Sequence, residues 1–266
     1  MHFTHILLKP TKRLEKKFPF IEELKKTEPP EESKQIANKF YKTNKLSDEL
    51  GYDMLIELND SIVYAFDILI DKKKIIIPEL NPTTIFYSNA IMYYRNLIES
   101  KRILFEQSPD IKNTSNPVDP NLFGTYFQFA VNCLINLQST VESFANRKIP
   151  ENYFTDSEGK QCQTSIFEKI DNVLPKLLEK QFKKEFKRDN FRVRKIIELR
   201  NKIIHLQPIE ETTNTQYKEV YRKMIKFDFS KAIIAVKHFV NFYEPELLEE
   251  CHCGKEYFYQ VSIIDK

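Results

Sequence analysis

The sequence predicts an all-α protein in which an antiparallel four-helix bundle follows an N-terminal helical extension. Two observations favour this class. Only four of the 266 residues are glycine, and a large antiparallel sheet needs glycine in its tight turns and bulges. Apolar residues also recur at helical spacing in several long segments. With 41% hydrophobic residues, a chain of this length buries a core without needing a disulfide or a structural metal.

Residues 1–118 are expected to form a mostly helical region of unknown role. Prolines divide the first forty residues into short segments that suit either helices or extended arms. Apolar residues over 50–69 recur at helical spacing and predict a long helix, followed by a buried apolar connection at 75–77. A second long helix is expected over 83–105.

The best candidate for a domain boundary is the proline-rich polar stretch 107–120. Residues 119–250 then form the bundle, with helices expected over 122–146, 165–186, 189–206 and 216–243. We expect a break at Pro175 and an interruption of the last helix at 228–230. Residues 251–266 form a tail. Residues 257–264 and 3–8 have strand-like patterns, so short strands at the two termini are expected to pair.

Several observations bear on location. The four cysteines show no repeated framework, which fits reduced thiols in a cytoplasmic protein. No apolar stretch approaches the roughly 20 residues that cross a bilayer, so no membrane partner is expected. The net charge of +3 is too small to identify a partner by itself. The loops and motifs typical of phosphate-loop, dinucleotide-binding, zincin and hydrolase proteins are missing from the sequence.

The pattern Cys251-His252-Cys253 is typical of metal binding. A tetrahedral structural site usually needs a second pair of ligands, and the other cysteines, Cys133 and Cys162, are isolated on different segments. We therefore expect no metal and no cofactor.

The most informative segment is Arg200-Asn201-Lys202-Ile203-Ile204-His205, at the end of the helix expected over 189–206. An Arg, four residues and a His, with Asn directly after the Arg, resembles the signature of the HEPN superfamily. The resemblance covers about 122–243 and includes the helix order. It implies a metal-independent endoribonuclease, active as a homodimer, with Arg200 and His205 catalytic and Asn201 supporting them. It also implies toxin-like or anti-phage RNA cleavage and a protein antitoxin or regulator as a further partner.

The chemistry fits these residue types independently of the resemblance. Cleavage of RNA through its own 2′-hydroxyl needs an acid or base with a pKa near neutrality, which His205 supplies, and a fixed cation, which Arg200 supplies. Five helical steps of roughly 100° place these two side chains about 140° apart. Convergence therefore needs a distorted helix end or a second subunit. Glu142, on the first bundle helix, is expected to support the site by pairing with Arg200.

A cluster of basic residues precedes and overlaps the motif, and we expect it to bind RNA phosphates. It consists of Lys184, Lys187, Arg188, Arg192, Lys195 and Lys202. The alternative is an ordinary charged helix face with pairs three or four residues apart. Arg and His are also common in the last turn of any helix, because they interact with its free carbonyls. Two other functions therefore stay open: a non-catalytic bundle that binds RNA, a nucleotide or a protein, and a scaffold with a chance motif.

Overall fold

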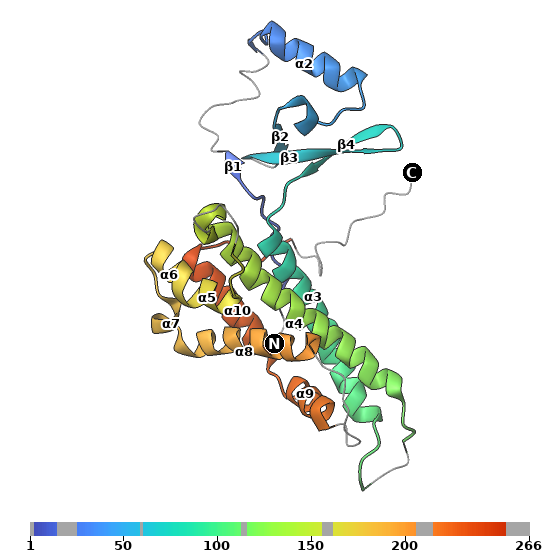
Figure 1. The fold of residues 1–266 in the computed structure, drawn as a ribbon. Coiled ribbons are helices and arrows are strands. Elements are labelled where there is room, and N and C mark those ends of the chain that lie inside the picture. Colours follow the sequence, from blue (N-terminus) through green and yellow to red (C-terminus); the bar gives the residue numbers. More distant parts are fainter. Residues whose placement is uncertain are drawn as a thin grey trace. The chain divides into compact units, whose positions relative to one another are not determined.

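The computed structural model describes residues 3–14, 26–58, 61–112, 116–155, 162–205 and 215–253. The chain divides into two compact units: Leu8–Asn81, called here the sheet unit, and Met1–Leu7 with Pro82–Lys266, called here the helical unit. Helices predominate, and a small antiparallel sheet occupies the sheet unit (Figure 1). The mainly helical class is confirmed. The N-terminal region, expected to be mostly helical, contains this sheet in place of the long helix expected over 50–69.

The sheet unit is built around one central strand. Its elements are β1 (Arg13–Leu14), α2 (Glu31–Lys42), a 3₁₀ turn (Asp48–Leu50), β2 (Met54–Leu58), β3 (Ser61–Ile70) and β4 (Lys73–Pro78). Strand β3 pairs antiparallel with each of the other three strands. Its pairing with β4 runs from Ala65 opposite Pro78 to Ile70 opposite Lys73.

Strands β2 and β3 occupy the segment where a long helix was expected. In β3, Val63, Ala65 and Asp67 are buried while Phe66 and Ile68 are exposed on the other face. Apolar side chains thus lie on both faces, and such a run matches a helical period as well as a strand. The β-branched and aromatic content of the run favours the strand. Asp71 and Lys72 form the two-residue turn between β3 and β4, and both have left-handed backbone angles (φ 49° and 64°). Glycine usually occupies such turn positions, but this hairpin forms without it.

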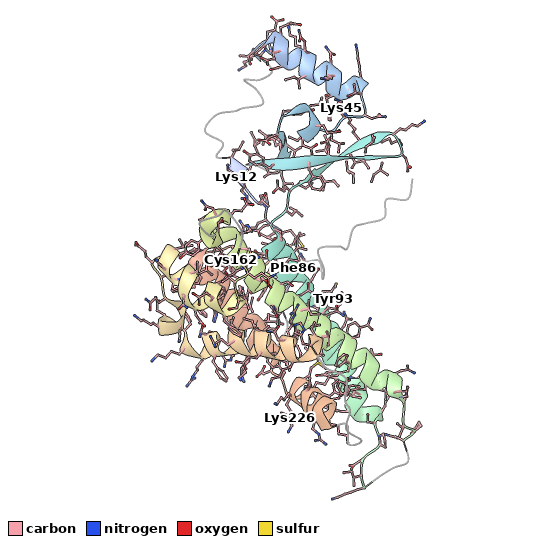
Figure 2. The ribbon with its side chains drawn as sticks, in the orientation of Figure 1. Lys12, Lys45, Phe86, Tyr93, Cys162 and Lys226 are labelled. Carbon is pink, nitrogen blue, oxygen red and sulfur yellow. The ribbon has the colours of Figure 1, made fainter. Side chains whose placement is uncertain are left out.

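Two sets of hydrogen bonds link the segment 40–47 to the sheet of the sheet unit. Buried Asp67 accepts hydrogen bonds from the backbone N–H (3.1 Å) and hydroxyl (2.6 Å) of Ser47. Burial by itself would raise the pKa of the Asp67 carboxyl, but these bonds outweigh it and lower the pKa. On β4, Lys74 Nζ donates to the carbonyls of Phe40 (2.6 Å) and Lys45, which is labelled in Figure 2.

The helical unit contains four of the longer helices and several short turns. Its elements are α3 (Pro82–Gln107), α4 (Pro120–Lys148), a 3₁₀ turn (Glu151–Phe154), α5 (Ile166–Glu168), a π turn (Lys169–Val173), α6 (Leu174–Leu177), α7 (Phe182–Glu185), α8 (Lys187–Ile204), α9 (Thr215–Ile225) and α10 (Phe229–Tyr243). The last helix is interrupted before Phe229, as predicted. The helix expected over 165–186 is divided into α5, the π turn, α6 and α7. Pro175, where a break was predicted, lies at the start of α6.

Helices α3 and α4 run side by side as a long hairpin, and α4, α8 and α10 pack against one another (Figure 1). All four helices contribute to one apolar core, represented by Tyr87, Ile91, Leu134, Phe144, Ile196, Ile197, Val236 and Phe239. The Tyr87 hydroxyl also donates to the Ile233 carbonyl across this core (3.1 Å). Because α3 shares the core, the boundary expected at 107–120 is a loop inside the helical unit, and the helical unit begins again at Pro82.

The N-terminal segment pairs with a segment that follows α10. Ile6 forms an antiparallel bridge with Glu250. The N–H of Leu7 donates to the Glu249 carbonyl, and the N–H of Cys251 donates to the His5 carbonyl, both at 2.9 Å. The expected partner strand over 257–264 lies outside the described residues.

All four cysteines of the chain are free thiols. Over the described ranges, none of the helices has both the length and the apolar character needed to cross a membrane.

Candidate nucleic-acid interface

Helix α8 carries both the predicted motif and most of the predicted RNA-binding residues. Val193, Ile196 and Ile197 are fully buried and recur every three or four residues, so one side of α8 packs into the core. The rest of the helix leaves Phe191 and Lys195 exposed. The core therefore holds α8 rigidly and presents its basic side outward.

The motif residues lie at the C-terminal end of α8. Arg200 is half-buried, and its Nη1 donates to the Oδ1 of Asn201 (3.2 Å). His205 is exposed and is the first residue beyond the helix. Its N–H still donates to the carbonyl of Asn201 (3.0 Å). Because that helical hydrogen bond is intact, α8 does not fray before His205.

Within the described part of the chain, Arg200 makes no hydrogen bond to His205 and no ion pair with Glu142. The expected Glu142–Arg200 pair is therefore wrong. Glu142 is half-buried on α4, and the Arg200 guanidinium is engaged locally by Asn201. Of the predicted supporting residues, the structure brings Asn201 to Arg200 and leaves Glu142 apart.

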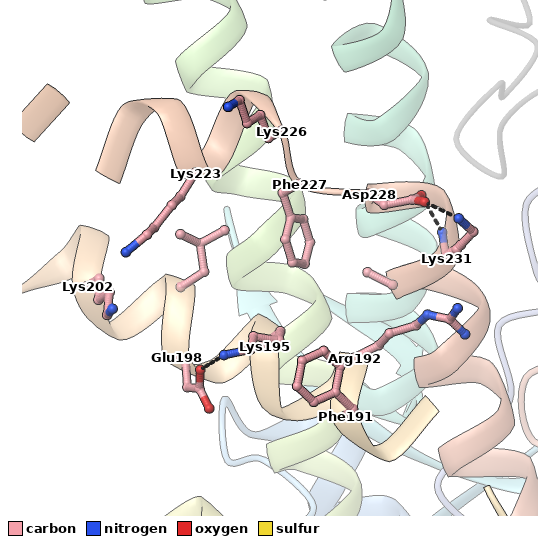
Figure 3. Close-up of a pocket in the computed structure, with 12 residues that line it drawn as sticks. Phe191, Arg192, Lys195, Glu198, Lys202, Lys223, Lys226, Phe227, Asp228 and Lys231 are labelled. Atoms are coloured by element: carbon pink, nitrogen blue, oxygen red, sulfur yellow. Dashed lines mark hydrogen bonds and ion pairs between the residues drawn. The ribbon is translucent and has the colours of Figure 1, made fainter. Parts of the chain in front are cut away.

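A groove of about 420 Å³ lies between α8, α9 and the start of α10, and is called here the α9 groove (Figure 3). Half of its lining residues are basic and two are phenylalanines: Phe191, Arg192, Lys195, Glu198, Leu199, Lys202, Lys223, Lys226, Phe227, Asp228, Lys231 and Ala232. Six of these side chains are cationic and two are anionic. The groove thus offers a net positive, partly aromatic surface.

The cations of the α9 groove fall into two groups. Four of them form ion pairs: Arg192 with Asp189 (2.6 Å), Lys195 with Glu198 (2.6 Å), Lys223 with Glu219, and Lys231 with Asp228 (2.8 Å). Lys202 and Lys226, the latter labelled in Figure 2, have no ion-pair partner within the described ranges. Cations without a carboxylate partner keep their full charge for an anionic ligand.

A second groove, of about 850 Å³, lies on the other side of Phe191 and is called here the α7 groove. It is lined by Asp171, Asn172, Pro175, Lys176, Gln181, Lys183, Lys184, Lys187, Asn190, Phe191 and Arg194. Arg194 pairs with Asp171. Its four lysines form no ion pair with any residue of the described segments.

Phe191 lines both grooves and is 60% exposed. Lys195 Nζ lies 5.3 Å from the centroid of its ring. An exposed ring beside cations is a surface on which a nucleic-acid base stacks. A binding role for Phe191 was not predicted from the sequence, because an aromatic residue at helical spacing usually belongs to the core.

All six predicted RNA-binding residues line a hollow of the surface. Arg192, Lys195 and Lys202 line the α9 groove, Lys184 and Lys187 line the α7 groove, and Arg188 lies with these last two in a third hollow at the start of α8. Arg192 and Lys195 pair with carboxylates three residues away, as an ordinary charged helix face would. The other four form no such pairs within the described chain.

Sequence reasoning missed several members of this surface. Lys223 lies on α9 and Lys226 directly follows it, and the approach of this helix to α8 is a tertiary contact. Asp189 holds Arg192 (2.6 Å) and also lies 2.8 Å from Nδ1 of His238 on α10. Burial by itself would raise the pKa of the Asp189 carboxyl, but the hydrogen bonds from His238 and Arg192 outweigh it and lower the pKa. Asp189 is thus an ionised anchor that positions Arg192 at the edge of the α9 groove.

Asp228, at the edge of the α9 groove, is the N-cap of α10. Its Oδ1 accepts hydrogen bonds from the Lys231 N–H (3.1 Å) and the Ser230 hydroxyl (2.7 Å). Burial by itself would raise the pKa of this carboxyl, but the hydrogen bonds from Lys231 and Ser230 outweigh it and lower the pKa to about 2. A lowered folded-state pKa stabilises the fold fully above about pH 4, and this contribution is lost as the pH falls toward about 2.

We expect Asp228→Ala to lower the free energy of unfolding by about 1 kcal/mol at neutral pH, a value set by the lost cap and by solvent screening of a half-exposed carboxylate. Asp228→Asn keeps a capping oxygen and is expected to stay within about 0.5 kcal/mol of wild type at neutral pH. Because the asparagine side chain does not ionise, this variant lacks the contribution to stability that is lost as the pH falls toward about 2. Urea unfolding from about pH 2 to pH 6 measures both effects, and a wild-type acid profile in the asparagine variant would contradict the assignment.

One group of metal-ligating side chains occurs among the residues that the structure describes, formed by His5, Cys251 and Cys253. The sequence pattern pointed to Cys251, His252 and Cys253. The structure groups the two cysteines with His5, from the opposite end of the chain, and His252 is not part of the group.

The fold and the site together define a mainly helical protein in which helix α8 is flanked by basic grooves. The chain matches no family model, no curated protein and no solved structure.

Proposed function

We propose that the helical unit binds RNA along the α7 and α9 grooves and cleaves it without a metal at Arg200 and His205, as the HEPN resemblance implies. One observation carries the proposal. The six predicted RNA-binding cations line hollows around α8, and the motif ends that same helix. A phosphate backbone held in the grooves is thereby placed on the element that carries the cleaving residues.

Binding uses the cations that have no partner among the described residues. Lys183, Lys184 and Lys187 on one side of Phe191, and Lys202 and Lys226 on the other, contact phosphates. Phe191 stacks on a base between them. A surface of this kind recognises flexible single strands better than a rigid duplex, because unstacked bases are needed for stacking.

Cleavage proceeds through the substrate's own 2′-oxygen. One His205 acts as general base or acid on the proton of the 2′-hydroxyl or of the leaving 5′-oxygen, and Arg200 stabilises the charge on the phosphorus centre. The 2′-oxygen forms a bond to phosphorus as the bond to the 5′-oxygen breaks, which yields a 2′,3′-cyclic phosphate and a 5′-hydroxyl. Because no hydrogen bond joins Arg200 to His205 within the described chain, we assign the complete site to a homodimer in which both motifs face one cleft.

The test is incubation of purified protein with a mixed RNA pool in EDTA, with the fold verified by circular dichroism in the same buffer. Fragments with 2′,3′-cyclic phosphate ends are the expected result. Binding without fragments leaves the binding function and removes the ribonuclease. Absence of both binding and cleavage contradicts the whole proposal.

The second candidate is a non-catalytic module that uses the same grooves to bind RNA. The observation that favours it is that no hydrogen bond joins Arg200 to His205 within the described chain. In either case we place the protein in the cytoplasm, in keeping with its four free thiols. A toxin-like or anti-phage role, with a protein antitoxin or regulator, follows from the resemblance alone.

A further inference from the structure

The N-terminal segment places a histidine against two cysteines from the other end of the chain. The backbone around His5 is held by the two hydrogen bonds to Glu249 and Cys251, and its side chain is only 3% exposed. Its Nε2 lies 3.4 Å from the Sγ of Cys253. Next to it, Ile6 is anchored in the apolar core, so the position of His5 is set by packing and by main-chain pairing together.

The ligand atoms of His5, Cys251 and Cys253 all lie within 4.8 Å of one another. In a tetrahedral zinc site, bonds of about 2.0–2.3 Å place neighbouring nitrogen and sulfur ligands roughly 3.5–3.8 Å apart. The observed spacing therefore needs only small side-chain movements to surround one ion. Two residues separated by one position, Cys251 and Cys253, act as a pair, and His5 supplies the third ligand.

We propose that His5, Cys251 and Cys253 bind a Zn²⁺ ion. Two thiolates and a neutral imidazole balance the charge of the ion, and binding releases the two thiol protons. Sulfur and nitrogen ligands select zinc over magnesium or calcium, which prefer oxygen. The nearby cation Lys237 is paired with Glu250 (2.8 Å), so its charge is compensated. Water or a further ligand completes the tetrahedron.

The ion joins the N-terminal segment to the segment after α10 in the helical unit. The existing link consists of the Ile6–Glu250 bridge with its two backbone hydrogen bonds (2.9 Å each), the burial of Ile6 in the core, and a longer hydrogen bond from Thr4 to Glu250 (3.4 Å). Of these contacts, the Thr4–Glu250 hydrogen bond is exposed to water. Three bonds to one ion add to this link, so zinc stabilises the folded chain.

The experiment measures zinc binding to the full chain after the protein is stripped of metal and reduced under argon. Competition with a chromophoric chelator is expected to give one tight site per chain. Cys251→Ser, Cys253→Ser and His5→Ala are each expected to weaken it more than about 100-fold, since loss of a direct ligand exceeds the 10–100-fold effect of outer-shell changes. Cys162→Ser is the matched control, because Cys162 is an exposed thiol outside the cluster, and it should bind as the wild type does.

Two further readouts make the result decisive. Co²⁺ in place of Zn²⁺ should give thiolate-to-metal charge-transfer absorption that the cysteine variants lose. Zinc should also raise the Tm of wild type and of Cys162→Ser but not of Cys253→Ser. Cys253 is exposed, so its variant tests the site even if His5→Ala fails to fold. Absence of stoichiometric binding, equal loss in the Cys162 control, or a Cys251–Cys253 disulfide in protein kept under argon would overturn the proposal.

Discussion

His205→Ala is expected to slow RNA cleavage by about 10²–10⁴-fold, the range for removal of a general acid or base. His205 is exposed and lies beyond the last turn of α8, so the change leaves the core untouched and the fold intact. RNA binding should change little. Single-turnover cleavage of a labelled RNA, with circular dichroism as the folding control, measures the effect. Cleavage at the wild-type rate would remove His205 from the reaction.

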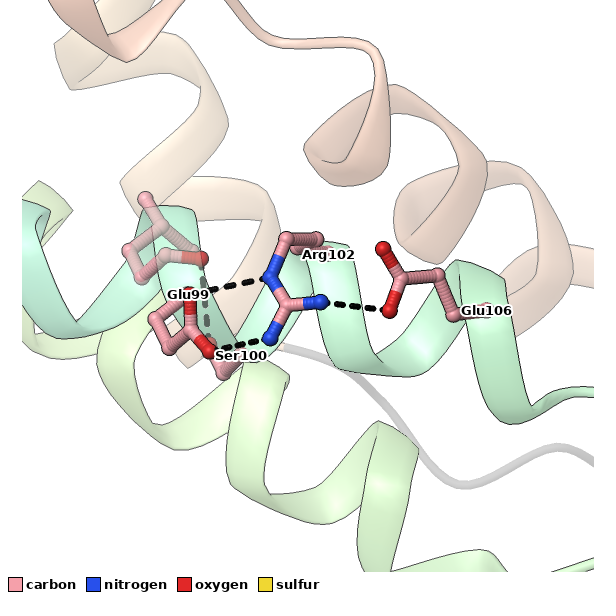
Figure 4. Close-up of polar contacts among 5 residues, drawn as sticks. Glu99, Ser100, Arg102 and Glu106 are labelled. Atoms are coloured by element: carbon pink, nitrogen blue, oxygen red, sulfur yellow. Dashed lines mark hydrogen bonds and ion pairs between the residues drawn. The ribbon is translucent and has the colours of Figure 1, made fainter.

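Arg200→Ala is expected to cost about 10²–10³-fold in the same assay, because a fixed cation is lost where charge develops. Arg200→Lys keeps the charge but not the planar fork, and should recover only part of the rate. The matched control is Arg102→Ala on α3, where the guanidinium is held between Glu99 and Glu106 (Figure 4). That variant should cleave as the wild type does. An equal loss in both arginine variants would point to a general effect of charge.

The proposed dimeric site predicts a particular result when subunits are mixed. Arg200→Ala and His205→Ala chains are each inactive, but a heterodimer of the two contains one complete site if Arg200 of one copy works with His205 of the other. Random mixing should then recover about a quarter of wild-type activity. Recovery of none would place both residues of each site in the same chain.

Removal of the α7-groove lysines that form no ion pair with a described residue is expected to have the second large effect. The triple variant Lys183→Gln, Lys184→Gln, Lys187→Gln loses three phosphate contacts. Each contact contributes about 0.7 to the salt slope of single-strand binding, so affinity should fall about 100-fold at 0.1 M salt and the slope by about 2. All three lysines are exposed, so stability should not change.

Titrations of a fluorescent single-stranded RNA over a range of salt concentrations test this result. Arg102→Gln is the control, since it removes one surface charge that two glutamates already compensate. The control should lose less than about threefold in affinity. An unchanged salt slope in the triple variant, or an equal loss per charge in the control, would contradict the assignment of the α7 groove.

The sequence was most informative where one side of a helix is buried for many turns. The helices expected over 83–105 and 122–146 correspond to α3 and α4, whose inward residues, such as Ile91 and Leu134, recur at helical spacing. The interruption before α10 was also expected. There Asp228 caps a new helix, and its capping role is a local property of the sequence.

The sheet could not be predicted in the same way, because its pattern is ambiguous. Phe66 and Ile68 are exposed on one face of β3 while Val63 is buried on the other. Such a run has no clean alternation, and the pairing that makes it a strand is supplied by β2 and β4, whose contacts a local pattern does not contain.

The candidate site was predictable in part for a related reason. The cations of α7 and α8 are near each other in sequence, and their common location on hollows of the surface follows from helix geometry. Lys226 and the His5 cluster depend on contacts between distant segments. The Glu142–Arg200 pair failed because residue type shows that two charges are able to pair, but not whether the packing of α4 and α8 brings them together.

The bridge between Ile6 and Glu250 also constrains how the protein folds. Thr4 and Glu250 are 246 positions apart in the chain, and the sheet unit is inserted between the two pieces of the helical unit. The N-terminal segment therefore pairs with residues that lie near the end of the described chain. We expect a contact of such high sequence separation to form late and to slow folding. The Ile6 side chain is only 1% exposed in the folded structure, but it stays exposed to water until this pairing has formed. A fragment that begins at Pro82 would lack the N-terminal segment that pairs with residues 249–251, and should populate a less cooperative, more protease-sensitive state.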